Sequence, residues 1–231
     1  MANVFDSYAR EYREIINSIS CIVGEKYEFF IRFRVYRMKH KLISIGAFAG
    51  IHRILDLGCG TGASGEILEA EFPQALITGV DSSQESIAQA HKQTLRRTTF
   101  LCEEAEALTL EDDSVDLIYS NGFFHHTLPE QRGIVLKELH RVVRPGGQIF
   151  IFENNPANPL TMWGMKNNPF DMNAKAITSR QMSALIKGSG FQLLQTAYYF
   201  FFPHSLRFLR WSEPTLEWLP FGAQYFIWAV R

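Results

Sequence analysis

Apolar residues recur with two different periods along the chain, and the change of period falls near residue 50. Before it, apolar side chains return every three or four positions, which is typical of amphipathic helices. We therefore expect two helices, over residues 3–20 and 25–48, with Gly24 between them. After it, short apolar runs alternate with helix-length amphipathic segments. This alternation predicts a largely parallel sheet with helices on both faces.

Five short apolar runs after residue 50 are predicted strands, and three amphipathic segments between them are predicted helices. The strands are expected at residues 53–57, 75–80, 99–102, 115–120 and 148–153. The helices are expected at residues 63–71, 82–94 and 129–142, with Ser82 or Ser83 as an N-cap and Pro129 in a first turn. The two glycines after Pro145 predict a turn before the fifth strand.

The last third of the chain is less regular. Residues 154–176 are rich in Asn and Pro but also contain Trp163, so we expect an ordered loop rather than a linker. The remaining expected elements are a helix from Thr178 or Ser179 to about Lys187, a strand at 191–202, an amphipathic and partly helical segment at 206–219, and a strand at 222–230.

The composition is that of one globular domain with additions. Of the 231 residues, 46% are apolar and 20% are charged, so a large core can form. The net charge of −1 gives no reason to expect nucleic acid as a partner. The three cysteines have no metal-binding or redox spacing, so we expect no metal and a reducing, cytoplasmic setting. A secretory signal is not expected, because no apolar segment led by Arg or Lys opens the sequence. A membrane span is not expected either, because the sequence has no apolar run of about 18 residues.

The segment Ile54–Gly62, with the sequence ILDLGCGTG, organises the rest of the chain. It combines a short strand, a turn with three glycines at alternate positions, and the start of a helix. Glycine lets the backbone turn sharply and lets a ligand approach closely, and the N–H groups at a helix start suit a polar or anionic group. A nicotinamide-dinucleotide loop has a similar pattern, whereas the Lys-Ser or Lys-Thr of a P-loop is absent. The segment therefore predicts a small-molecule site.

Acidic residues lie at or just after the ends of three predicted strands. Asp56 precedes the first glycine, Asp81 ends the second strand, and Glu103 and Glu104 follow the third. The carboxyl ends of parallel strands meet at one edge of a sheet, which is where ligands bind in such folds. We therefore expect these carboxylates to surround the same ligand.

Five segments, taken in order, resemble the motif set of class I S-adenosylmethionine-dependent methyltransferases. They are Ile54–Gly62, Gly79–Asp81, Cys102–Leu108, Asp116–Asn121 and Val142–Gly147, and they cover roughly residues 50–155. The resemblance implies an α/β, Rossmann-like, seven-stranded mixed sheet of order 3-2-1-4-5-7-6, with strand seven antiparallel, helices on both faces and an N-terminal helical cap. It also implies a single methyltransferase domain over residues 1–231. Its parts would be the cap at 1–50, a cofactor-binding half at 51–155, and an acceptor-side half at 156–231 with a C-terminal hairpin.

The resemblance further implies which residues hold the methionine end of S-adenosylmethionine. Asp56 is expected near the methionine ammonium, and Asn121 beside the methionine. Tyr12, in a segment that resembles the family's N-terminal helix, would meet the carboxylate; a core tyrosine on an amphipathic helix is the alternative. The backbone expected to pass close to methionine and sugar belongs to Gly58, Cys59 and Gly60.

The adenosine end has its own set of implied contacts. Asp81 is expected to accept hydrogen bonds from both ribose hydroxyls, which requires an acceptor-only side chain. Ser82 is expected beside the adenine. Glu104 would accept from the adenine amino group while the Ala105 N–H donates to a ring nitrogen, and Glu103 is the alternative to Glu104.

Three side chains are candidate catalytic groups. His125 and His126 follow the fourth strand, and a histidine can act as a general base for a hydroxyl or an amine. The alternative is that one of them packs or caps the loop. Glu153, at the end of the fifth strand, would orient an acceptor; a solvated or loop-bonding acid is the alternative. Methyl transfer needs mainly alignment, because the sulfonium is already a good leaving group.

Two later segments, Asn158–Thr161 and Pro169–Asp171, resemble a subgroup of bacterial methyltransferases and are expected to form an acceptor wall. Members of this subgroup often occur with polysaccharide or glycolipid enzymes; a histidine of the subgroup is replaced here by Asn154. The resemblance thus implies a small-molecule acceptor methylated at oxygen, with a glycolipid or polysaccharide precursor as one class. The alternatives are a nicotinamide-dependent oxidoreductase and a non-catalytic protein that keeps the cofactor site.

Aromatic residues crowd into residues 198–221, and basic residues into 32–41. The aromatic segment suggests a peripheral membrane or lipid contact, with Arg207 and Arg210 near headgroups. A homodimer contact, or packing against the N-terminal helices, is the alternative. The basic residues, Arg34 among them, are expected on the solvated faces of their helix.

Overall fold

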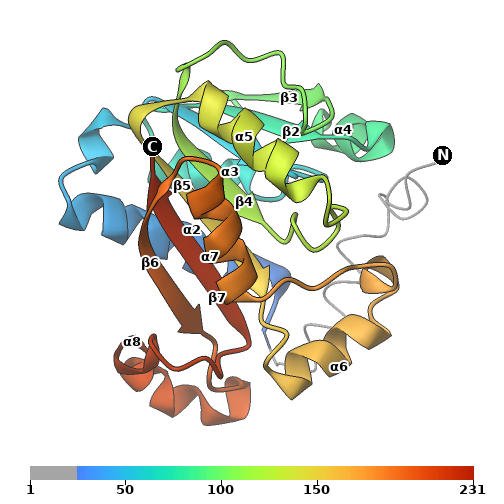
Figure 1. The fold of residues 1–231 in the computed structure, drawn as a ribbon, viewed down its shortest axis with the longest axis vertical. Coiled ribbons are helices and arrows are strands. Elements are labelled where there is room, and N and C mark those ends of the chain that lie inside the picture. The colour runs from blue at the N-terminus through green and yellow to red at the C-terminus, as the bar shows by residue number, and fades with distance from the viewer. Residues whose placement is uncertain (1–24) are drawn as a thin grey trace.

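The computed structural model describes residues 25–231 and is built on one seven-stranded sheet. The strands are β1 (Arg53–Leu57), β2 (Leu76–Asp81), β3 (Thr98–Cys102), β4 (Val115–Asn121), β5 (Val143–Asn154), β6 (Gln192–Tyr199) and β7 (Gln224–Val230). Their order is β3-β2-β1-β4-β5-β7-β6 (Figure 1). β1 to β5 are parallel, and β7 is antiparallel to both of its neighbours. The strand order and the antiparallel seventh strand implied by the motifs are thus confirmed.

Helices connect most of the strands. The α-helices are α2 (Tyr27–Ser44), α3 (Gly65–Glu71), α4 (Gln84–Ala90), α5 (Arg132–Val142), α6 (Pro159–Asn167), α7 (Ser179–Gly188) and α8 (Glu213–Leu216). Short 3-10 helices are η2 (Phe48–Gly50), η3 (Pro169–Asp171) and η4 (His204–Ser212). In the part of the chain that the structure describes, no helix has the length and apolar character needed to cross a membrane.

The two faces of the sheet carry different cores, because successive side chains of a strand point to opposite faces. On one face, aliphatic residues such as Leu55 and Ile149 pack against α5 and α7. On the other, aromatic residues such as Phe150 and Phe226 pack against α2 and α3. The apolar side chains of α2 that recur at helical spacing are buried there: Ile31, Val35, Met38 and Leu42. Ile45 is exposed, because the helix ends at Ser44 and not at residue 48 as predicted.

The Asn- and Pro-rich segment 154–176, predicted to be a loop, forms α6 and η3 instead. Asn158 accepts a hydrogen bond from the Thr161 N–H at 3.0 Å, and Pro159 occupies the first turn. Asn168 caps η3 in the same way, through the Phe170 N–H at 3.2 Å. Asparagine followed by proline is a helix-start signal as well as a loop signal, which explains the error.

Several further boundaries differ from prediction, and two of these differences involve turns. Residues 145–147 lie within β5 as an irregularity, where the pairing with β4 shifts between Val115 and Leu117 and Gly146 has a φ of +77°. The helix predicted to begin at Pro129 begins at Arg132, after a turn. Neither difference moves the carboxyl edge of the sheet, where the predicted site residues lie.

Candidate functional site

A cavity of about 640 Å³ opens where the carboxyl ends of β1, β2, β4 and β5 meet. α2 closes one side of it, and α6 and η3 close another. The predicted site residues that line it are Asp56, Gly58, Cys59, Gly60, Asp81, Ser82, Glu104, Ala105, Asn121, His125 and His126. Glu153 is buried behind His125, and Tyr12 lies outside the described residues. Residues spread over much of the chain therefore share one cavity.

The glycine turn after β1 forms the floor of this cavity. Gly58 and Gly60 have φ values of +71° and +54°, in the left-handed region that favours glycine. A Cβ on Gly58 would lie 2.7 Å from Phe123, whereas a Cβ on Gly60 would meet nothing within 4 Å. Gly58 is therefore needed for packing, and Gly60 for the backbone conformation beside open space.

Asp81, at the end of β2, is fixed by backbone donors. Its Oδ2 accepts from the Gly60 N–H and its Oδ1 from the Ser83 N–H, both at 2.9 Å. Ser83 in turn caps α4 by accepting from the Ser86 N–H. A carboxylate oxygen can accept more than one hydrogen bond. The backbone donors thus fix the orientation of the Asp81 carboxylate at the cavity wall.

Asp56 is a buried carboxyl, 3% exposed, at the end of β1. Burial raises its pKa; the Ser64 hydroxyl, which donates to it, opposes this and the charge of Asp81 adds to it, so the pKa reaches about 7. Burial and the same two carboxylates also hold the pKa of the Cys59 thiol well above its usual range. A cationic ligand beside Asp56 would restore the charged carboxylate.

The loop after β3 contains Glu103 and Glu104, and the sequence did not decide which of them contacts the ligand. The Glu103 carboxylate accepts from the N–H of Thr109 at 3.0 Å and from its hydroxyl, so it stabilises its own loop. Both glutamates line the cavity, but within residues 25–231 no such hydrogen bond to the loop is seen for the carboxylate of Glu104, which is next to the buried Ala105. This arrangement favours Glu104 over Glu103 for contact with a ligand.

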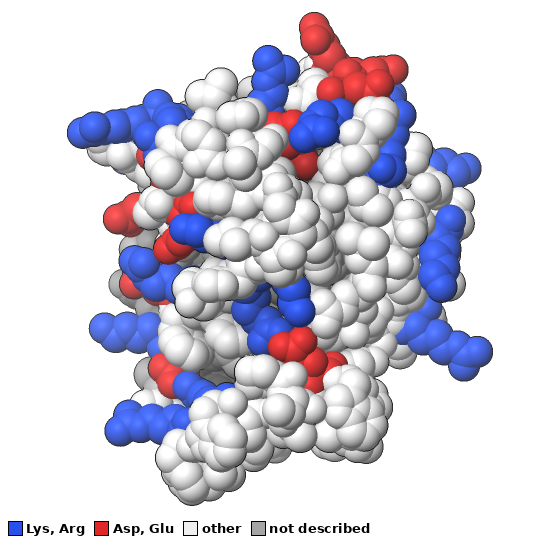
Figure 2. Space-filling model, turned by 90° about the vertical axis from the view of Figure 1, so that its left-hand side faces the viewer, with Lys and Arg blue, Asp and Glu red and all other residues white. Residues whose placement is uncertain are grey.

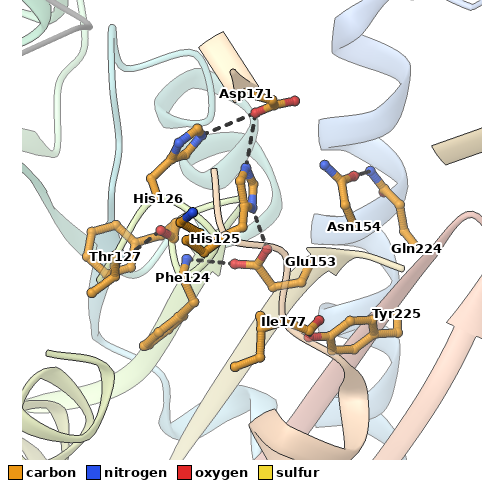
Figure 3. Close-up of polar contacts among 12 residues, drawn as sticks. Phe124, His125, His126, Thr127, Glu153, Asn154, Asp171, Ile177, Gln224 and Tyr225 are labelled. Carbon is orange, nitrogen blue, oxygen red and sulfur yellow. Dashed lines mark hydrogen bonds and ion pairs between the residues drawn. The ribbon is translucent and has the colours of Figure 1, made fainter. Parts of the chain in front are cut away.

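The candidate catalytic residues meet a fourth one, Asp171 of η3 (Figure 3). His125 Nδ1 lies 2.6 Å from Glu153 Oε2, and its Nε2 lies 3.3 Å from Asp171 Oδ1. His126 Nε2 lies 3.4 Å from the same Asp171 oxygen. Glu153 also accepts from the Phe124 N–H at 2.7 Å. The two histidines therefore converge on Asp171 at the cavity wall.

The electrostatics of the two histidines are opposite. Burial lowers the pKa of His125, but the charges of Glu153 and Asp171 and their hydrogen bonds outweigh it and raise the pKa to about 10. Burial lowers the pKa of His126, and the charge of His125 lowers it further, to about 3. Burial raises the pKa of Asp171, but its contacts with the two histidines bring it below its usual range. Without a ligand, the positive charge of this cluster therefore lies on His125, between two carboxylates.

A methyltransferase-domain family model matches residues 54–147, which include the glycine turn, Asp81 and the β4 loop. Residues 54–147 therefore form a methyltransferase domain, and the order of the sheet is that of the class I S-adenosylmethionine-dependent methyltransferases.

Relatives of this methyltransferase differ in what they methylate. The chain is 36% identical over 121 residues to a malonyl-[acyl-carrier protein] O-methyltransferase from Bacillus cereus. The matched residues make up 52% of this chain and 38% of the relative. It is 35% identical over 118 residues to a ubiquinone/menaquinone biosynthesis C-methyltransferase from Syntrophotalea carbinolica, covering 49% of each. The chain thus spans half or less of the length of these two curated relatives.

Solved structures support the same fold over nearly the whole methyltransferase. A Thermotoga maritima protein described as a possible histamine N-methyltransferase superposes with a TM-score of 0.68 at 20% identity, covering 98% of this chain and 97% of that one. At this identity the likeness concerns the fold alone.

Arg34 of α2 is a site residue of the methyltransferase that sequence analysis missed. It was predicted to be solvated, but it is 4% exposed and lines the cavity. Its Nη2 donates to Gln224 Oε1 at 2.6 Å, while its Nη1 is buried without a hydrogen-bond partner. Among residues 25–231, no carboxylate forms an ion pair with it. The signal was its spacing, because Arg34 is three residues after the buried Ile31 and four before the buried Met38.

The remaining residues of interest lie around the end of β5. Asn154 Oδ1 accepts from Gln224 Nε2 at 3.0 Å, and both residues line the cavity. Asn121 ends β4 at the same level. Asp171 was placed in the acceptor wall by its Pro-Phe-Asp segment, but its contact with the histidines depends on α6 and η3, which the sequence did not predict.

Proposed function

We propose that this chain transfers a methyl group from S-adenosylmethionine to a small-molecule acceptor, at oxygen. One observation carries the proposal: a single cavity joins the glycine turn and Asp81 to the histidines and Asp171. A donor lying across the glycine turn would have its reactive methyl directed toward an acceptor held beside the histidines. Alignment of this kind is the main requirement of methyl transfer.

The donor residues follow from the chemistry of S-adenosylmethionine. Asp81 accepts hydrogen bonds from the ribose hydroxyls, and Glu104 and the Ala105 N–H contact the adenine, beside Ser82. Asp56 faces the methionine ammonium, while the backbone of Gly58, Cys59 and Gly60 passes under the methionine, next to Asn121. In this proposal residues 51–155 bind the donor and residues 156–231 frame the acceptor.

Arg34 supplies the positive charge for the donor's carboxylate. The guanidinium is buried with one nitrogen unpartnered. Arg34 and Asp56 both line the cavity, and the charges of both act on the pKa of the buried Tyr119 hydroxyl. A cation and an anion in one cavity complement the carboxylate and ammonium of an amino acid.

The acceptor lies against His125, His126 and Asp171, with Glu153 acting through His125. Its oxygen attacks the methyl carbon, the carbon–sulfur bond breaks, S-adenosylhomocysteine leaves, and the hydroxyl proton passes to water in the cavity. This polar cluster, opposite the donor, is the group in position to bind the hydroxyl and to favour loss of its proton.

A glycolipid or polysaccharide precursor is the acceptor class that we propose. The segment that resembles the polysaccharide-associated subgroup forms α6 and η3 beside the cavity. Phe201, Phe202 and Pro203 also line the cavity and lead directly into η4, whose Phe208 and Trp211 are exposed. Figure 2 shows the lower end of this side of the molecule, where η4 and α8 lie in Figure 1, as largely uncharged. Such a surface suits the apolar part of an acceptor or its carrier membrane.

The test is transfer of an isotopically labelled methyl group from S-adenosylmethionine to extracted glycolipids and sugar intermediates, followed by mass spectrometry. The proposal predicts a product heavier by one methyl group, labelled at oxygen. Binding of a nicotinamide cofactor without binding of S-adenosylhomocysteine would identify an oxidoreductase instead. Donor binding without turnover on any acceptor would identify a non-catalytic protein.

A further inference from the structure

The side chains of His125, His126 and Asp171, here called the histidine cluster, have a geometry that hydrogen bonding alone does not require. Each offers one ligand atom, and the three atoms lie within 4.8 Å of one another. Figure 3 shows both imidazole rings, from the loop after β4, turned toward the carboxylate of Asp171 in η3. We propose that the histidine cluster binds a divalent transition-metal cation at the acceptor side of the cavity.

The distances fit such a cation. Ligand atoms about 2.0–2.1 Å from a tetrahedral zinc ion lie roughly 3.3–3.4 Å from one another. Asp171 Oδ1 lies 3.3 Å from His125 Nε2 and 3.4 Å from His126 Nε2. These separations are longer than an ordinary charged hydrogen bond but match two edges of the tetrahedron.

Two of the proposed ligands, His125 and Asp171, also make hydrogen bonds through the atoms that do not face the metal, as metal ligands usually do. A histidine that binds a metal through one ring nitrogen donates its other N–H to a carboxylate or carbonyl. His125 does so through Nδ1, 2.6 Å from Glu153, which is fixed by the Phe124 N–H at 2.7 Å. Asp171 Oδ2 accepts from Asn168 Nδ2 at 2.8 Å, which leaves Oδ1 for the metal. The supporting contacts thus fix two of the three ligand atoms, those of His125 and Asp171.

The histidine cluster is open toward the interior of the cavity. His125, His126 and Asp171 all line the cavity, so a fourth coordination position faces its interior. Three protein ligands and one open position are typical of metal sites that bind a substrate oxygen. If the proposed function is correct, the metal would bind the acceptor hydroxyl and lower its pKa, so that its proton would pass to water in the cavity as the oxygen attacks the methyl carbon. The acceptor class is then one with a hydroxyl, and optionally a neighbouring oxygen, that can coordinate a metal.

The donor set selects the kind of metal. Two imidazole nitrogens and one carboxylate suit zinc, cobalt or ferrous iron, whereas magnesium and calcium prefer oxygen ligands only. The sequence did not suggest this site, because Asp171 is far from the adjacent histidines along the chain and no metal-binding spacing links them.

The competing arrangement is metal-free. A proton on His125 Nε2 would then turn its ring into an imidazolium that bridges Glu153 and Asp171. Metal binding replaces that proton, so the two arrangements exclude each other and can be distinguished by metal titration of the purified, chelator-stripped chain.

The experiment titrates Zn²⁺ by calorimetry and Co²⁺ by visible absorption, with Mg²⁺ as a comparison. We expect stoichiometric Zn²⁺ binding, a Co²⁺ spectrum with nitrogen ligands, and no Mg²⁺ binding at the same concentrations. Glu153→Gln, which changes only the support of His125, is expected to weaken zinc binding about 10–100-fold. Asp171→Asn and His126→Gln remove a ligand each and are expected to weaken it at least as much.

His52→Gln is the matched control, because this histidine is exposed and far from the cluster in the fold. Each variant's fold is checked by thermal unfolding, and S-adenosylhomocysteine is titrated into the same samples. Absence of stoichiometric Zn²⁺ and Co²⁺ binding by the folded wild-type chain would overturn the metal site. Equal zinc affinities in wild type, Asp171→Asn and His126→Gln would do the same. Either result together with retained S-adenosylhomocysteine binding refutes the metal and leaves the proposed function standing.

Discussion

Two charged residues of this protein are buried although charges prefer water, and the burial of each has a consequence that can be measured. Asp56 and Arg34 are both buried beside the same cavity, with no ion pair between them among the contacts of the described residues. A buried unpaired charge is costly unless a ligand compensates it. Both residues are therefore expected to cost stability in the free protein and to contribute affinity once a zwitterionic ligand is bound.

The raised pKa of Asp56 predicts that donor binding depends on pH. With a pKa of about 7, it loses its charge as the pH falls through neutrality, and a neutral carboxyl attracts an ammonium less. We expect the affinity for S-adenosylhomocysteine to fall about tenfold from pH 8 to pH 6. Asp56→Asn should bind weakly and show no such dependence. Calorimetry across this range tests it, and a wild-type affinity that does not change with pH would refute it.

Asp56 also predicts the sign of a stability effect. Its pKa in the folded protein is raised above the unfolded value, so its contribution to stability is present at low pH and is lost as the pH rises through about 7. Asp56→Asn should therefore increase the free energy of unfolding of the ligand-free protein at pH 8, by roughly 1–4 kcal/mol. Denaturant unfolding measures it; a destabilised variant at that pH would contradict the assignment.

Arg34 predicts a selective loss of affinity. Arg34→Met keeps the length and apolar stem of the side chain but removes the charge. We expect it to weaken S-adenosylhomocysteine binding about tenfold or more, because a charged hydrogen bond to the carboxylate is lost. Binding of 5′-methylthioadenosine, which has no amino acid group, should change less than about twofold. Equal losses for both ligands would place the effect elsewhere than at the carboxylate.

At the scale of elements, strand ends were predictable and the acceptor wall was not. Asp56 and Asp81 are placed by strands whose apolar pattern is strong, so their meeting at one edge followed from the parallel sheet. Asp171 is placed by α6 and η3, whose helical starts depend on asparagine caps within a segment typical of loops. Arg34 was misplaced because its residue type was weighed above its helical spacing.

α6 provides a prediction at this scale. Asn158→Ala removes the side-chain acceptor that caps the helix and should cost about 1 kcal/mol of stability. It should also loosen the acceptor wall, raising the KM for the acceptor while the affinity for S-adenosylhomocysteine stays within about twofold. Asn167→Ala, the same change at the opposite end of α6, is the control. A larger effect on the donor than on the acceptor would contradict the division of the cavity.

At the scale of the whole molecule, the surface has an uneven chemistry. Lys and Arg are spread over the side seen in Figure 2 rather than gathered in one field, in keeping with a net charge of −1. Among residues 25–231, the three most exposed aromatic side chains, in contrast, lie on one C-terminal segment: Trp211 is 79% exposed, Trp218 73% and Phe208 67%. Exposed tryptophans near an active-site cavity are typical of contact with lipid or with another protein.

This surface predicts vesicle binding. The full chain should float with vesicles that contain anionic lipid, and less with neutral ones, since Arg207 lies among the aromatic residues. The double variant Trp211→Ser with Trp218→Ser should lose most of the bound fraction, whereas Ile134→Ser, an exposed residue of α5, should not. Loss of a dimer in size-exclusion chromatography, without any vesicle binding by the wild type, would show that the surface joins two copies instead.

The central claim, that this cavity binds S-adenosylmethionine through the acids at the strand ends, is tested most directly by calorimetry with S-adenosylhomocysteine. The wild-type chain is expected to bind it at one site. Asp81→Ala should reduce the affinity at least about 100-fold, because two hydrogen bonds to a charged acceptor are lost together. Asp112→Ala, an exposed acid at the opposite edge of the sheet, should bind like the wild type. Wild-type affinity in Asp81→Ala, or no binding by the wild type, would contradict the account.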